Sequence, residues 1–70
     1  MASVMTQDTI GMLKRNILGN LDRSIRDLQT SIIELQQLGY VTEAGTLGDI
    51  LAALITERAN TAIALEGAPA

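Results

Sequence analysis

The chain has 70 residues and a net charge of −3, from five Lys and Arg against eight Asp and Glu. It contains no His, Cys, Trp or Phe, so disulfides are excluded and the commonest metal ligands and general bases are missing. The negative net charge opposes a general affinity for nucleic acids or anionic membranes. We therefore expect a non-enzymatic protein with no cofactor and no metal.

Small size limits the stability that one copy of the chain can reach. A domain of this length buries only about 60% of the surface that its unfolded chain exposes. Hydrophobic residues make up 47% of the sequence, but Tyr40 is the single aromatic among them, so the core must be aliphatic. With disulfides and metals set aside, self-association is the usual remaining means of stabilisation. We expect one domain over residues 1–70 that associates with itself.

The first predicted element is a helix over about residues 7–38. Its apolar residues return every three or four positions, the spacing that lines one side of a helix. In the second half of the helix the intervals alternate four and three, as in a coiled coil. Gly39 should end the helix, because glycine is favoured just beyond a helix C-terminus. The apolar stripe consists of Ile10, Leu13, Ile17, Leu21, Ile25, Leu28, Ile32, Leu35 and Leu38.

The second predicted element is a helix over about residues 43–66, with Thr42 as its N-cap. A second possible start is Thr46, which opens a sequence of the capping-box type and would leave residues 42–45 as a loop or a poorly ordered first turn. Residues 1–6 and 67–70 are expected to be short flexible ends. Two helices joined by one tight connection predict an all-α antiparallel hairpin, which we expect to form a four-helix bundle by dimerisation.

The second helix has two adjacent apolar sides of different texture. One side carries large residues such as Leu47, Leu51 and Leu54, which can pack on the first helix. The other side consists mostly of glycine and alanine, which would let a second copy approach closely. The alternative is that these small residues merely fill the surface. The predicted self-association residues are Gly45, Gly48, Ala52, Ile55, Ala59 and Ala62.

Arg58 falls among the large apolar residues of the second helix. A buried cation needs a partner of opposite charge. Folding the hairpin about Val41 places Arg58 opposite Ser24, with Asp27 one turn further along. The sequence therefore predicts a buried ion pair between Arg58 and Asp27, or an Arg58 head group that reaches out to solvent. The functional alternative is that Arg58 holds an anion of a ligand or partner inside the bundle.

A basic group on the first helix supports a rival function. Arg15, Arg23 and Arg26 lie on the side opposite the apolar stripe, where they could contact phosphates. A dimeric helical hairpin is also the architecture of the plasmid copy-number regulators that bind paired RNA loops. The chain resembles those regulators in plan, without a shared motif. The resemblance implies a nucleic-acid-binding regulator as the alternative function.

Three further residues are candidate contacts for a partner protein. Leu18 and Ile33 lie beside the apolar stripe, and Tyr40 lies at the turn as the one aromatic anchor. The leading hypothesis is a small protein–protein interaction module, an adaptor, inhibitor, assembly factor or minor structural subunit, that acts as a homo-oligomer with a dimer favoured. A third hypothesis is an accessory subunit of an enzyme complex. Since neither a signal peptide nor a membrane span is visible in the sequence, we expect a soluble cytoplasmic protein.

Overall fold

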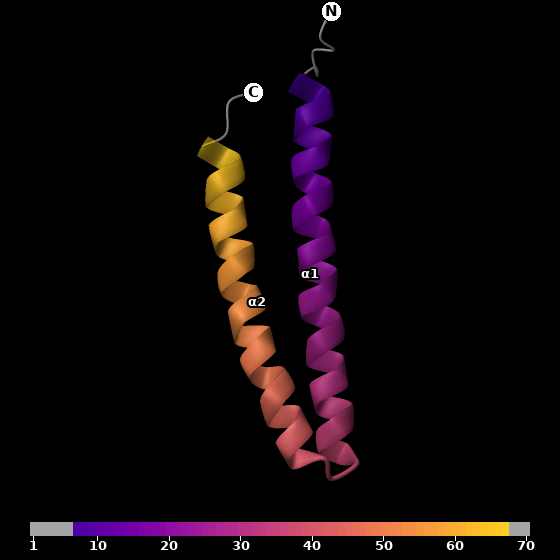
Figure 1. Cartoon of the computed structure of the whole chain (residues 1–70). Coiled ribbons are helices and arrows are strands. Elements are labelled where there is room, and N and C mark those ends of the chain that lie inside the picture. Colours follow the sequence, from indigo (N-terminus) through magenta and orange to yellow (C-terminus); the bar gives the residue numbers. More distant parts are fainter. Residues whose placement is uncertain (1–6, 68–70) are drawn as a thin grey trace, which may run out of the picture.

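The computed structural model describes residues 7–67, which form two long helices joined by a short turn (Figure 1). Helix α1 spans Gln7–Gln37 and helix α2 spans Val41–Gly67. The helices run antiparallel and side by side, and the described residues contain no strand. The predicted all-α antiparallel hairpin is confirmed, while its association into a four-helix bundle stays a prediction.

The turn ends α1 with a Schellman motif. The Tyr40 N–H donates to the Leu35 carbonyl at 2.9 Å, and the Gly39 N–H donates to the Gln36 carbonyl at 3.1 Å. These are the two hydrogen bonds that define the motif. Gly39 has a φ of +88°, a left-handed conformation that costs a residue with a Cβ about 1 kcal/mol or more. The glycine stop is therefore confirmed, with Gln37 instead of residue 38 as the last helical residue.

Helix α2 begins earlier than the sequence predicts. It starts at Val41, so Thr42 lies inside its first turn and is not the N-cap. The Ala44 N–H donates to the Tyr40 carbonyl at 3.0 Å, which opens the helical hydrogen bonds directly after the turn. Thr46 lies well inside the helix, where its Oγ1 donates to the Thr42 carbonyl at 3.2 Å. The alternative start at Thr46 is therefore wrong, because the Schellman turn needs only three residues and leaves none for a loop.

The predicted flexible ends fall mostly outside the described residues. This holds for residues 1–6 and 68–70, whereas Gly67 is the last residue of α2. Within residues 7–67, neither helix combines the length and the apolar character that crossing a membrane requires.

Half-buried residues mark the sides on which the two helices meet. Along each helix they recur at intervals of three and four residues, as in an antiparallel coiled coil. Only Ala44 among the described residues is fully buried, with 3% of its surface exposed. We call this contact the seam. Its half-buried residues include Lys14, Leu18, Leu21, Ile25, Leu28, Ile32 and Leu35 on α1, and Leu47, Leu51, Leu54, Arg58 and Leu65 on α2.

Two residues near the start of the predicted apolar stripe do not face α2. Leu13 and Ile17 are 40% and 43% exposed, whereas Leu18 and Lys14 are half-buried. Two packed helices stay in contact by following a 3.5-residue repeat. Extended from the middle of α1 toward its N-terminus, this repeat places Leu18 and Lys14 against α2. The apolar residues Leu13 and Ile17 fall outside the repeat and therefore stay exposed. The end of the stripe also lies outside the seam, since Leu38 is 72% exposed.

Candidate self-association surface

Large apolar side chains lie on the outside of the hairpin. Among the described residues, ten large apolar side chains are 40–72% exposed, and Ala44 is the one residue that is fully buried. Scattered exposed apolar residues are normal on protein surfaces. Here, however, ten such residues stand against one fully buried residue, so one hairpin leaves many large apolar side chains in contact with water. These residues are Met12, Leu13, Ile17, Ile33, Leu38, Tyr40, Val41, Ile50, Ile55 and Ile63.

The predicted self-association residues occupy one side of α2, next to the seam. Gly45, Ala52 and Ala59 are exposed, and Ile55 is 47% exposed. The other two residues are half-buried, as expected where this side borders the seam. Helix α1 therefore leaves these positions largely uncovered. We call this set the small-residue surface: Gly45, Gly48, Ala52, Ile55, Ala59 and Ala62.

Two glycines of the small-residue surface have no role in packing within one chain. A Cβ added at Gly45 or Gly48 would meet no atom within 4 Å, and neither residue has a positive φ. In a helix interior, each glycine is less favourable than alanine by up to about 1 kcal/mol. The hairpin alone does not require their small size, as is also true of Gly19 on α1. A close approach by another helix would use it.

The ion pair across the seam joins Arg58 to Asp22, so the predicted partner Asp27 is wrong. Arg58 Nε donates to Asp22 Oδ1 at 2.9 Å, and Arg58 Nη2 donates to Asp22 Oδ2 at 3.4 Å. The compact turn centres the hairpin on Tyr40 instead of Val41. This change moves the residue opposite Arg58 by two positions, to Asp22.

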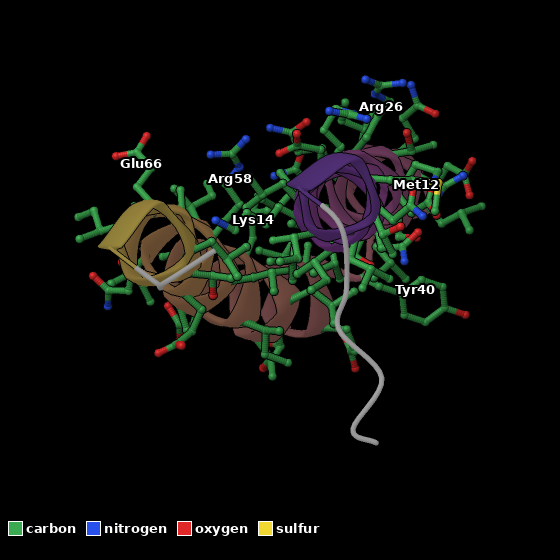
Figure 2. The ribbon with its side chains drawn as sticks, turned by 90° about the horizontal axis from the view of Figure 1, so that it is seen from above. Met12, Lys14, Arg26, Tyr40, Arg58 and Glu66 are labelled. Atoms are coloured by element: carbon green, nitrogen blue, oxygen red, sulfur yellow. The ribbon has the colours of Figure 1, made fainter. Side chains whose placement is uncertain are left out.

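The Arg58–Asp22 pair lies at the edge of the seam and is not buried. The Arg58 side chain is 34% exposed and the Asp22 side chain is 49% exposed. The pKa of Arg58 is raised, mainly by its hydrogen bond to Asp22 and also by the negative charge of the Asp22 carboxylate. Figure 2 shows the Arg58 side chain extending outward from α2 and the Lys14 amine in the space between the two helices.

Arg58→Met should leave the hairpin folded. Solvent-exposed ion pairs contribute little to stability, and methionine can cover the apolar side of the seam. We expect unchanged helicity and an equal or higher melting temperature by circular dichroism. Asp22→Asn is the matched control that removes the other partner. A collapse of helicity in Arg58→Met alone would contradict this account of the pair.

The three arginines of the nucleic-acid hypothesis lie on the solvent side of α1. Arg15, Arg23 and Arg26 are all exposed, and Figure 2 shows Arg26 projecting away from α2. Arg23 Nη2 donates a hydrogen bond to Asn20 Oδ1. Within residues 7–67, none of the three forms an ion pair. Nucleic-acid binding stays a prediction.

The three candidate contacts for a partner protein divide into two groups. Ile33 and Tyr40 are 54% and 53% exposed, and Tyr40 points outward beside the turn in Figure 2. Leu18 is half-buried and belongs to the seam. The first two residues remain accessible to a partner, whereas Leu18 is used within the chain.

The described part of the chain offers no enclosed space for a small ligand. Residues 7–67 form no pocket, and they contain no group of three or more carboxylates that could hold a metal ion. Comparisons with protein-family models, with curated proteins and with solved structures give no match to this chain.

Proposed function

We propose that this chain is a small, non-enzymatic protein–protein interaction module that acts as a homo-oligomer, with a dimer as its basic unit. In a cell it would serve as an adaptor, inhibitor, assembly factor or minor structural subunit. The small-residue surface would hold the copies together. Exposed residues outside that surface, such as Ile33 and Tyr40, would then bind another protein.

One observation carries this proposal: a single buried residue stands against ten large apolar side chains that are 40–72% exposed. Burial of apolar surface is the main favourable term in folding, about 25 cal/mol for each Å² removed from water. A hairpin with one narrow seam gains little of it. Packing against a second copy of the same chain would bury more apolar surface without the need for a longer chain. Self-association is therefore a direct source of additional stability.

Light scattering across a hundredfold concentration range tests the proposal. We expect a mass that is a stable multiple of 7.4 kDa, with high helicity by circular dichroism on the same samples. A helical monomer at every concentration would overturn self-association. A poorly helical monomer would also overturn it, and would indicate that another protein supplies the missing part of the core.

A further inference from the structure

We propose that the second copy packs on the small-residue surface in an antiparallel orientation, with the turn of each hairpin beside the free helix ends of the other. This inference rests on the self-association proposed above and adds the orientation of the two copies. Two independent features of the hairpin support it: its charge distribution and the sizes of the residues on α2.

The two halves of the hairpin carry opposite charge. Residues 27–53, the half that contains the turn, include four acids and no Lys or Arg, a net charge of −4. The remaining residues hold all five cations and four acids, a net charge of +1. Parallel packing would bring the two acidic halves together, whereas antiparallel packing sets each acidic half beside the more basic half of its partner. Charges this close are not fully screened at physiological salt, where the Debye length is about 8 Å.

Residue sizes on the small-residue surface match in the antiparallel orientation. Its six positions are symmetric about the middle of α2, between residues 53 and 54. Antiparallel packing about that point gives every facing pair at least one glycine or alanine, which lets the two α2 helices approach closely along their contact. Parallel packing would instead stack Ile55 on Ile55 and leave a gap between facing glycines. The antiparallel pairs are Gly45 with Ala62, Gly48 with Ala59, and Ala52 with Ile55.

Disulfide cross-linking tests the orientation, because the chain has no cysteine of its own. Gly48→Cys and Ala59→Cys are prepared as separate variants and oxidised alone and mixed. A disulfide requires Cα atoms less than about 7 Å apart. In the antiparallel dimer, residue 48 lies opposite residue 59 of the partner, while like residues are about 16 Å apart at 1.5 Å per residue. We expect a cross-linked dimer only in the mixture, identified as the mixed species by intact mass.

The other outcomes separate this inference from the proposed function. Cross-linking of each variant with itself would overturn the antiparallel orientation and leave self-association intact. A dimeric mass without any cross-link would overturn the small-residue surface as the contact. A monomeric mass for the parent chain would overturn both proposals. Gly48→Cys should leave the hairpin folded, because a Cβ at this position meets no atom within 4 Å.

Discussion

Ala52→Glu combined with Ala59→Glu is expected to reduce the light-scattering mass to that of the 7.4 kDa monomer. Both residues lie on the small-residue surface, where the proposed dimer would bury two unpaired carboxylates from each copy. Burying an unpaired charge costs several kcal/mol. We therefore expect the dissociation constant to rise by at least about 100-fold, since each 1.4 kcal/mol is a factor of ten. Helicity should fall as well, because the monomer has almost no core.

The matched control is Ala53→Glu combined with Asn60→Glu. It adds two glutamates to α2 at the same seven-residue spacing, at positions that are also exposed, on the other flank of the helix. We expect this variant to keep the mass of the parent. The idea of close helix contact is wrong if the Ala52 and Ala59 variant retains the parent's mass and melting curve.

Leu28→Ala is expected to lower the free energy of unfolding by about 2 kcal/mol, the low end of the range for leucine deletions in cores. Leu28 is half-buried near the middle of the stretch of seam that the sequence and the structure agree on, so its removal leaves a gap between the helices. Thermal and urea unfolding followed by circular dichroism measure the change. Protein concentration must be matched, because the stability of an oligomer depends on it.

Ile50→Ala provides the comparison for Leu28→Ala. Ile50 is 49% exposed on α2, on the side away from the small-residue surface, and alanine is the better helix former. We expect a stability equal to the parent's or slightly above it. Equal losses in the two variants would show that the seam does not hold the hairpin together.

Much of the fold follows from local sequence signals. The three-and-four spacing from Leu21 to Leu35 predicts α1 and its coiled-coil contact, and Gly39 predicts the turn. Both signals act within a few residues, through side-chain periodicity and through the conformational freedom of glycine. The structure confirms them. At the start of α2, the Val41 N–H donates to the Gly39 carbonyl at 3.0 Å, so the turn itself satisfies a free N–H group without Thr42 as a cap.

Two of the wrong predictions are the residues at the start of α1 that face α2 and the partner of Arg58. Both depend on how the two helices pack together. Whether Leu18 or Ile17 faces α2 is decided by the path of the partner helix, and the sequence of α1 alone does not contain that path. The partner of Arg58 depends on the length of the turn, where a difference of one residue moves the facing position by two. A prediction from one sequence places such pairs only as accurately as it places the turn.

The candidate surface was visible in the sequence as a run of small residues on one side of α2. The structure adds that α1 leaves this side largely uncovered and that Gly45 and Gly48 have open space around them. Spacing alone gives no such information, because glycine in a helix also occurs where the backbone of the same chain passes close by. Self-association itself stays a prediction until the mass is measured.

The three-residue turn has a consequence for the kinetics of folding. Residues near the turn that face each other across the seam are separated by few positions in the sequence, so closing the hairpin requires only short loops. Proteins dominated by such local contacts fold on a timescale on the order of microseconds to milliseconds. In the proposed dimer, the collision of two copies is then the slower step. The observed folding rate should fall as the chain is diluted, although the hairpin itself closes at a rate that dilution does not change.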